Sequence, residues 1–350
     1  MDFSRIIRSW YAKNRRDLPW RRTKDPYRVW LSEIILQQTR VAQGLAYYHA
    51  FTGKFPDVKK LAAAKEQEVL KLWQGLGYYS RARNLHFSAK KIVKETGGQF
   101  PGTYKDLLRL KGVGDYTAAA IASICFGEAR PVVDGNVYRV LSRIFGIKTP
   151  IDSTEGKKIF RETAAALIDH RDPGNFNQAL MEFGALQCVP RNPDCAVCPF
   201  VQQCEARKKN TIALLPVKAK KTKTRDRYFN YIVIRRGENV LLKKRTGNDI
   251  WKNMYDFPLV ETEKPVSPEK LFSLEEVKAI TGNKKPVLTG RIHETKHVLS
   301  HQNIHARFFE VKAGTKRVAG EKLVACGRDD LHKYPVPVII SRYLDNAWRE

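Results

Sequence analysis

The sequence predicts a multidomain protein in which an all-α domain is followed by a smaller α/β domain. Three observations support this fold class. The chain has 350 residues, which is too long for one compact core. Residues 1 to about 205 carry apolar residues at three-and-four spacing between segments rich in Gly and Pro, a pattern typical of amphipathic helices. After Arg227, short apolar runs are bounded by turn residues, which indicates strands.

The helices that this spacing predicts cover residues 31–48, 65–73, 80–96, 104–110, 115–123 and 157–168. In the second part, two apolar runs, 231–234 and 240–242, flank Arg-Gly-Glu-Asn and predict a hairpin. A further strand is predicted over 304–311 and a closing helix near 338–348. Between the two parts, residues 207–227 hold nine Lys or Arg and a single acid, Asp226. This stretch is either a solvated interdomain linker or a linker that also contacts phosphates.

The chain is strongly basic. Lys and Arg number 63 against 36 Asp and Glu, a net charge of +27. Such a surplus favours a polyanionic partner, with nucleic acid ahead of a membrane surface. No stretch approaches the roughly 20 apolar residues of a membrane span, and the N-terminus lacks the apolar region of a signal peptide. We expect a protein of the cytoplasm that does not bind membranes; a monomer of bacterial type, associated with the nucleoid through DNA, is a further expectation that composition alone does not establish.

Four of the six cysteines lie close together and predict a metal centre. Cys188, Cys195, Cys198 and Cys204 follow the spacing C-x6-C-x2-C-x5-C. Soft sulfur ligands suit zinc or an iron–sulfur cluster, and the lack of histidine ligands argues against a finger of the Cys2His2 type. The spacing alone leaves zinc and [4Fe–4S] open.

Two further features stand upstream of these cysteines. Gly112-Val113-Gly114 lies between two predicted helices, where glycine permits positive φ and close approach to a ligand. The N-terminus of the following helix offers free N–H groups to an anion. About twenty residues later comes Asp134, which by itself is as well explained as a turn residue or helix cap.

Together, the glycine turn, the aspartate and the cysteine loop resemble the endonuclease III superfamily of helix-hairpin-helix DNA glycosylases in order and spacing. The resemblance implies that Gly112, Val113 and Gly114 hold a DNA phosphate, that Asp134 is catalytic and that the four cysteines bind [4Fe–4S]. It also implies the domain boundaries. The glycosylase domain would cover 1–206, with a six-helix module over about 27–130 and an iron–sulfur module from 1–26 and 131–206 that contains the cluster loop 188–204. The basic linker 207–227 and a second domain over 228–350 would follow.

Tyr116 decides which branch of the superfamily the chain resembles. Members that also cut the strand have a Schiff-base lysine at this position, so no lyase step by that route is expected. The segment instead resembles the adenine DNA glycosylase family, which hydrolyses adenine from mispairs with 8-oxoguanine. Residues 18–41 and 75–84 (GLGYYSRARN) are further matches. Glu33 matches the catalytic acid of that family, although alone it reads as a surface glutamate paired through Gln37 or Arg40.

The resemblance assigns roles to individual residues. Glu33 would protonate the leaving adenine, and Asp134 would stabilise the oxocarbenium-like sugar. Tyr116 and Asn136 would position them by hydrogen bonds. Two residues would enter the base stack from opposite sides, Tyr78 and Gln38. The adenine pocket would be lined by Arg16, Trp20, Arg21, Leu36 and Glu182. Packing roles remain open for Trp20, Leu36 and Tyr78.

Residues 228–350 resemble the Nudix fold, with Trp251 and the segment Tyr-Asp-Phe-Pro at 255–258 as the best match. The Nudix hydrolase signature is missing between residues 256 and 282, so no pyrophosphatase activity is expected. His-Val-Leu-Ser-His at 297–301 resembles the loop that probes 8-oxoguanine. Leu299 stands where an aromatic residue is usual, whereas Ser300 and His301 can hydrogen-bond the lesion or cap a strand. The expected partner is double-stranded DNA that contains 8-oxoguanine·A or G·A.

Three other functions remain as alternatives. One is an endonuclease III-like glycosylase and lyase for oxidised pyrimidines, against which Tyr116 and the long C-terminal extension argue. Another is a noncatalytic iron–sulfur DNA-binding protein, which the presence of both Glu33 and Asp134 disfavours. The third is nucleotide hydrolysis by the second domain, which the missing signature disfavours.

Overall fold

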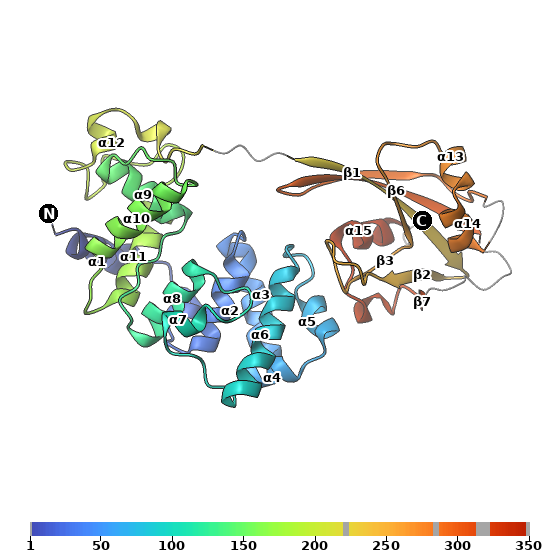
Figure 1. The fold of residues 1–350 in the computed structure, drawn as a ribbon, viewed down its shortest axis with the longest axis horizontal. Coiled ribbons are helices and arrows are strands. Elements are labelled where there is room, and N and C mark those ends of the chain that lie inside the picture. The colour runs from blue at the N-terminus through green and yellow to red at the C-terminus, as the bar shows by residue number, and fades with distance from the viewer. Residues whose placement is uncertain (1, 220–223, 283–286, 313–322, 348–350) are drawn as a thin grey trace. The chain divides into compact units, whose positions relative to one another are not determined.

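The computed structural model describes residues 2–219, 224–282, 287–312 and 323–347. By contact density the chain divides into two compact units (Figure 1). The helical unit consists of Met1–Ala63 and Asn84–Lys221, and the sheet unit consists of Ala64–Arg83 and Thr222–Glu350. In the part of the chain that the structure describes, no helix is long and apolar enough to cross a membrane.

Helices account for all of the regular structure up to Leu214. In chain order they are α1 (Phe3–Asn14), the 3-10 turn η1 (Pro19–Arg21), α2 (Pro26–Leu36), α3 (Val41–Lys54), α4 (Val58–Ala63), α5 (Glu66–Leu72), α6 (Ser80–Thr96), α7 (Tyr104–Leu107), α8 (Asp115–Phe126), α9 (Gly135–Phe145), α10 (Thr154–Leu167), α11 (Pro173–Leu186), α12 (Glu205–Lys208) and the 3-10 turn η2 (Ile212–Leu214). Of these, α5 and the first turn of α6 fall within the residues of the sheet unit.

One core of the helical unit joins the N-terminal helix to helices far along the chain. Ile7 of α1, Phe160 of α10 and Phe183 of α11 are buried together, and α9 contributes the apolar face around Val140. Helix α1 contacts α11 directly. As a result, the segment that follows α1 runs beside α11.

The prediction of one continuous helix over 31–48 is wrong. Helix α2 ends at Leu36 and α3 begins at Val41, because Gln38 has a φ of 55° and the left-handed conformation ends the helical path. The two helices then pack closely. A Cβ added at Gly44 would lie 2.7 Å from Leu36 Cδ2, so the small residue permits this approach.

The other predicted helices are present with shifted ends. The prediction over 80–96 matches α6 at both ends, and the predictions over 65–73, 115–123 and 157–168 correspond to α5, α8 and α10. The prediction over 104–110 is too long, because α7 stops at Leu107. The backbone N–H of its C-cap residue Leu108 donates to the carbonyl groups of Asp106 and Tyr104. The next residues form the glycine turn before α8.

The sheet unit contains a seven-stranded sheet within the described residues. Its strands are β1 (Arg225–Arg236), β2 (Asn239–Lys244), β3 (Tyr255–Asp256), β4 (Leu259–Thr262), β5 (His293–Val298), β6 (Gln302–Lys312) and β7 (Leu323–Cys326). The main order is β3-β2-β1-β6-β5, with β4 paired to β1 and β7 paired to β2. The pair β1–β6 is parallel and the other pairs are antiparallel. The predicted hairpin is confirmed, since Arg236 pairs with Asn239 across Gly237, whose φ is 56°.

Helices cover both faces of this sheet. Phe309 of β6 is buried with α13 (Pro268–Ser273) and α14 (Glu275–Thr281). On the opposite face, Phe308 stacks on Tyr343 of α15 (Val338–Ala347), with ring centroids 4.2 Å apart. Adjacent residues of one strand point to opposite faces, so the sheet lies between two helical layers as an α/β domain.

The predicted linker over 207–227 includes residues of regular secondary structure near its two ends. Helix α12 and the turn η2 occupy its first part, and β1 begins at Arg225. The intervening chain is also held by the helical unit: Ile151 N donates to Val217 O at 3.0 Å, and Ala219 N donates to Asp152 Oδ1 at 3.0 Å. Part of the predicted linker is therefore attached to the helical unit, while most residues of 207–219 are exposed or half-buried.

Candidate active site

A cavity of about 830 Å3 opens in the helical unit where four helices meet. Helix α8 contacts both α2 and α11, and α9 contacts α11. This packing brings residues from distant parts of the chain to one wall. The lining includes ten of the site residues that the sequence predicted: Arg16, Trp20, Arg21, Glu33, Leu36, Gln38, Tyr116, Asp134, Asn136 and Glu182.

Glu33 lies on α2 and is only 9% exposed. Its alternative interpretation as a surface glutamate is therefore wrong. Burial raises the pKa of Glu33 to about 7, and the nearby charge of Asp134 acts in the same direction. A hydrogen bond from Tyr116 and the charge of Arg21 oppose this rise. Glu33 is thus a carboxyl group that can both hold and release a proton near neutral pH.

Asp134 is the N-cap residue of α9, so its cap role and its position in the cavity coincide. Its Oδ1 accepts from the backbone N–H groups of Asn136 at 2.9 Å and Val137 at 2.8 Å. Asn136 Nδ2 donates to the other oxygen at 2.8 Å. Burial raises the pKa of Asp134, while these three donors and the charge of Arg139 oppose the rise by stabilising the anion.

Tyr116 lies on the first turn of α8 between the two carboxyl groups. Burial raises its pKa well above the usual value, and the charges of Glu33 and Asp134 add to that rise. Its hydroxyl group is therefore neutral and hydrogen-bonds the carboxyl group of Glu33. The same hydroxyl lies 3.4 Å from Met181 Sδ of α11.

Glu182 lies at the centre of a group of cations at the cavity wall. It is 1% exposed, and both of its oxygens accept from the guanidinium groups of Arg16 and Arg21 at 2.5–2.9 Å. Arg16 N adds a bond of 2.9 Å. These donors overcome the effect of burial and lower the pKa of Glu182 to about 2. Its oxygens are thus occupied by the two arginines, which Glu182 holds in place at the cavity.

Sequence reasoning missed several residues that line the same cavity. Gln178 and Met181 on α11 lie there, as does Arg139 on α9. Tyr11 donates to Gln178 Oε1 at 3.0 Å, which leaves the amide nitrogen of Gln178 as its remaining polar group. The i, i+4 spacing of Gln178 and Glu182 places both on one face of α11 and could have indicated it.

Arg139 connects this cavity to the cysteine loop. Its Nη2 donates to Asn136 Oδ1 at 2.9 Å and to Gly184 O at 2.5 Å, and its Nε donates to Cys188 O at 2.7 Å. One guanidinium group therefore fixes the amide of Asn136 and the first residue of the cysteine loop at the same time.

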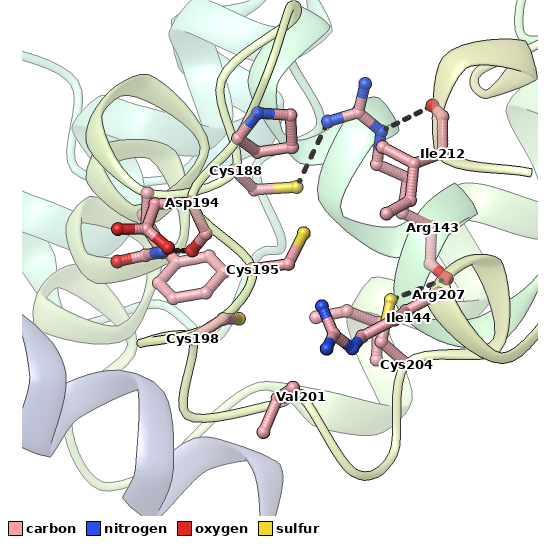
Figure 2. Close-up of a pocket in the computed structure, with 13 residues that line it drawn as sticks. Arg143, Ile144, Cys188, Asp194, Cys195, Cys198, Val201, Cys204, Arg207 and Ile212 are labelled. Carbon is pink, nitrogen blue, oxygen red and sulfur yellow. Dashed lines mark hydrogen bonds between the residues drawn. The ribbon is translucent and has the colours of Figure 1, made fainter. Parts of the chain in front are cut away.

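The four cysteines surround a common space, to which Arg143 and Arg207 also contribute (Figure 2). Cys188, Cys195, Cys198 and Cys204 line it together with apolar residues such as Ile144 and Val201. Among the described residues, no three His, Cys, Asp or Glu side chains are close enough to hold one metal ion. The donor set is nevertheless four soft sulfur atoms beside two cations, which suits an anionic thiolate-bound group.

The two glycines of the turn before α8 differ in backbone conformation: Gly112 is left-handed and Gly114 is extended. Gly112 has a φ of 84°, and an added Cβ would lie 2.8 Å from Asn84 Cβ. Gly114 is the N-cap residue with a φ of −100°, and nothing lies within 4 Å of an added Cβ. The expected need for positive φ thus applies to Gly112 only, whereas Gly114 keeps the space before the α8 N-terminus open. Val113 between them is buried.

The remaining predicted site residues belong to the sheet unit. Tyr78 has a φ of 47° and is 41% exposed, and the guanidinium group of Arg81 lies 5.6 Å from its ring centroid. Leu299, Ser300 and His301 form the turn between β5 and β6, which Leu299 N closes by donating to Gln302 O at 2.8 Å. Ser300 Oγ and His301 Nδ1 are 3.2 Å apart, and both residues are exposed.

Comparison with known proteins finds two domain families in this chain. A family model described as HhH-GPD superfamily base excision DNA repair protein matches residues 31–166, and a NUDIX domain model matches residues 230–346. A solved thermostable thymine-DNA glycosylase superposes with a TM-score of 0.55 at 32% identity, over 59% of this chain and 95% of that chain. The predicted fold class, a helix-hairpin-helix glycosylase domain followed by a Nudix-like α/β domain, is confirmed.

Individual relatives identify the branch. The chain is 36% identical over 302 residues to the adenine DNA glycosylase of Buchnera aphidicola subsp. Acyrthosiphon pisum, which covers 86% of this chain and 85% of that relative. It is 47% identical over 216 residues to the adenine DNA glycosylase of Homo sapiens, over 59% of this chain and 40% of that relative. The chain therefore belongs to the adenine DNA glycosylase family.

Proposed function

We propose that the chain is a monofunctional adenine DNA glycosylase of base excision repair. It hydrolyses the N-glycosidic bond of adenine opposite 8-oxoguanine, and opposite guanine, in double-stranded DNA. The observation that carries the proposal is the pair Glu33 and Asp134 in one cavity, one a buried carboxyl group with a pKa of about 7 and the other a carboxyl group whose oxygens accept from three N–H donors. Glycosidic cleavage needs one carboxyl group as an acid and another as an anion, and we assign these roles to Glu33 and Asp134.

Glu33 acts as the general acid. Adenine leaves readily only when a ring nitrogen is protonated, and we assign this proton transfer to the Glu33 carboxyl group and adenine N7. The Tyr116 hydroxyl orients the carboxyl group through its hydrogen bond. After the base has left, the Glu33 carboxylate accepts a proton from the attacking water.

Asp134 stabilises the sugar. Positive charge develops on the deoxyribose as the bond breaks, and an anion opposite that charge lowers the barrier or traps the cation. Asn136 keeps the carboxylate in position by its bond of 2.8 Å. With Tyr116 in place of a lysine, the site offers no amine there, so the product is an intact strand with an abasic site.

The adenine must leave the duplex to reach these groups, at a cost of a few kcal/mol. The cavity of about 830 Å3 can hold a flipped nucleotide. Arg16, Trp20, Arg21 and Leu36 line its wall, and Glu182 holds the two arginines. Tyr78 and Gln38 fill the space in the base stack, and the backbone of residues 112–114 binds a phosphate.

Recognition of the opposite base is assigned to the sheet unit. Adenine is undamaged, so the mispair must be recognised through its partner. The exposed turn at Leu299, Ser300 and His301 carries two polar side chains that can contact the edge of 8-oxoguanine. We assign residues 1–206 to catalysis and 228–350 to lesion recognition, in a protein that acts as a monomer.

A [4Fe–4S] cluster is assigned to Cys188, Cys195, Cys198 and Cys204. Four thiolates leave no open ligand position, so the cluster keeps the basic loop in shape and supplies no chemistry to base release. The convergence of four sulfur donors beside Arg143 supports this assignment.

Single-turnover base release from a duplex with one 8-oxoguanine·A pair tests the proposal, with samples split between hot alkali and no treatment. Strand cleavage only after alkali is expected. Cleavage without alkali would overturn the monofunctional assignment. Binding with no cleavage in either sample would favour a noncatalytic DNA-binding protein.

A further inference from the structure

Arg143 of α9 is a buried arginine that the proposed chemistry does not use. The residue is 3% exposed, although it carries a charged side chain. Its Nη1 donates to Val189 O at 2.8 Å and lies 3.5 Å from Cys188 Sγ, and its Nη2 donates to Pro190 O at 3.0 Å. On this side the guanidinium group holds the start of the cysteine loop.

The other edge of the same guanidinium group faces the connection to the sheet unit. Arg143 Nε donates to Ile212 O at 3.1 Å and to Leu215 O at 3.3 Å (Figure 2 shows Arg143 between Cys188 and Ile212). Two further bonds, Ile151 N to Val217 O and Ala219 N to Asp152 Oδ1, continue the attachment up to Ala219. We call residues 212–219 the anchored segment.

A buried cation is costly unless negative charge is near, and no carboxylate is among the hydrogen-bond partners found for Arg143 in the described residues. Its partners are four carbonyl oxygens and the sulfur of Cys188. Cys204 Sγ lies 3.4 Å from the backbone carbonyl oxygen of Arg143, which is a contact of the main chain, so the link between the guanidinium group and the loop is made at the start of the loop. There, Cys188 is a proposed cluster ligand, and the carbonyl groups of the next two residues, Val189 and Pro190, bind the guanidinium group.

We infer that Arg143 is a positioning residue that holds Ile212 and Leu215, the first part of the anchored segment, on the helical unit only while the cysteine loop holds its iron–sulfur cluster. The inference rests on the proposed cofactor. Loss of the cluster releases Cys188 from its ligation, residues 188–190 lose their fixed positions, and Arg143 no longer holds Ile212 and Leu215. The attachment of the anchored segment then reports the state of the cluster.

Hydrogen exchange of the full-length protein, resolved by peptide, tests the inference. The wild type is compared before and after removal of iron by oxidation and chelation, with iron and sulfide measured on each sample. Iron removal should speed exchange in peptides over 212–219 by about tenfold, the equivalent of losing roughly one charge-assisted hydrogen bond. Peptides from α8 serve as an internal reference for global unfolding.

Variants separate the two sides of the contact. Arg143→Met removes the donors and should show fast exchange over 212–219 with iron present and no further increase when iron is removed. Arg143→Lys should restore part of the protection. Arg139→Met is the matched control, because Arg139 bonds Cys188 O but none of residues 212–215. This control should leave the segment protected while iron is bound.

Unchanged exchange over 212–219 after verified iron loss in the wild type would overturn the inference alone, and so would full protection in Arg143→Met. Purified protein without iron and sulfide would overturn both the cofactor assignment and this inference. If Arg143→Met fails to fold, the wild-type comparison still decides.

Discussion

Asn136 donates to Asp134 through a side-chain hydrogen bond of 2.8 Å, and its own orientation is fixed because Arg139 donates to its Oδ1 at 2.9 Å. The carboxyl group of Asp134, to which we assign the stabilisation of the sugar, is thus held by a neutral amide that cannot turn over without breaking a bond to a buried arginine.

Asn136→Leu, which keeps the shape but removes the donor, should slow base release by about 10- to 100-fold, the value of one charge-assisted hydrogen bond. The check is single-turnover base release together with a binding titration on the same duplex. DNA affinity should change little. A rate within twofold of the wild type, with folding intact, would mean that Asn136 does not position Asp134.

Base release should depend on pH through Glu33. With a pKa of about 7, Glu33 is protonated and competent as an acid below neutrality, so the rate should fall as pH rises above that value. Tyr116→Phe removes a hydrogen bond that lowers the Glu33 pKa, so the alkaline limb should move to higher pH. The measurement is the pH profile of base release at subsaturating enzyme. A limb that moves to lower pH in Tyr116→Phe would contradict the assigned direction.

Stability should depend on pH through the same group. The folded-state pKa of Glu33 is raised from 4.5 to about 7, so the folded state binds this proton more tightly. The contribution of this proton to the free energy of unfolding is fully present below the pKa of Glu33 in the unfolded state. It is lost as the pH rises through the pKa of Glu33 in the folded state. Between about pH 5 and about pH 8 the wild type should lose up to about 3 kcal/mol of unfolding free energy relative to Glu33→Gln. Urea unfolding of both proteins at the two pH values checks this. The same variant should have no base release, and an equal pH response in both proteins would rule out Glu33 as the source.

The two glycines of the turn before α8 should respond differently to alanine. Gly112→Ala places a side chain at a φ of 84° and against Asn84, so it should cost about 1–2 kcal/mol of stability or more. Gly114→Ala meets open space at an extended φ and should fold normally, but its methyl group would block a phosphate at the α8 N-terminus. Thermal unfolding and DNA binding of each variant separate the two effects. Normal DNA affinity in Gly114→Ala would remove the phosphate site.

The double variant Ser300→Ala with His301→Ala should reduce the preference for 8-oxoguanine·A over G·A more than it reduces the rate on G·A. The reason is that both side chains are exposed at a turn, where their hydrogen-bonding groups are accessible to a base outside the unit. Rates on the two mispairs give the ratio. Glu238→Ala, at the tip of the other hairpin, is the matched control. An unchanged ratio in the double variant would exclude these residues from lesion recognition.

The sequence carried much of this site because its signals are local. The turn at 112–114, the cap at Asp134 and the cysteine spacing each lie within a few residues, and helix periodicity located α6 at both ends. The break at Gln38 was missed because backbone conformation there depends on α3 packing back on α2 through Gly44. Periodicity cannot report such a contact.

Residues whose roles depend on tertiary pairing were harder to predict. Glu33 looks like a surface residue until α8 covers it, and its raised pKa is a property of that burial. The positions of Gln178 and Arg139 in the cavity follow from the packing of α11 on α8 and α9, which no local pattern encodes. Likewise, the basic composition of residues 207–227 predicts a linker, but it cannot predict that the carbonyl groups of Ile212 and Leu215 accept hydrogen bonds from the buried Arg143.

The pairing of α1 with α11 sets an order for folding during synthesis. Phe3, Ile7 and Tyr11 pack with residues of α9, α10 and α11 and with Phe200, so the apolar face of the first helix stays uncovered while more than a hundred residues are made. The bonds from Arg16 and Arg21 to Glu182 also form late, because Glu182 lies on α11. A nascent chain halted before α11 would expose part of the apolar face of α1 and would leave Arg16 and Arg21 without Glu182.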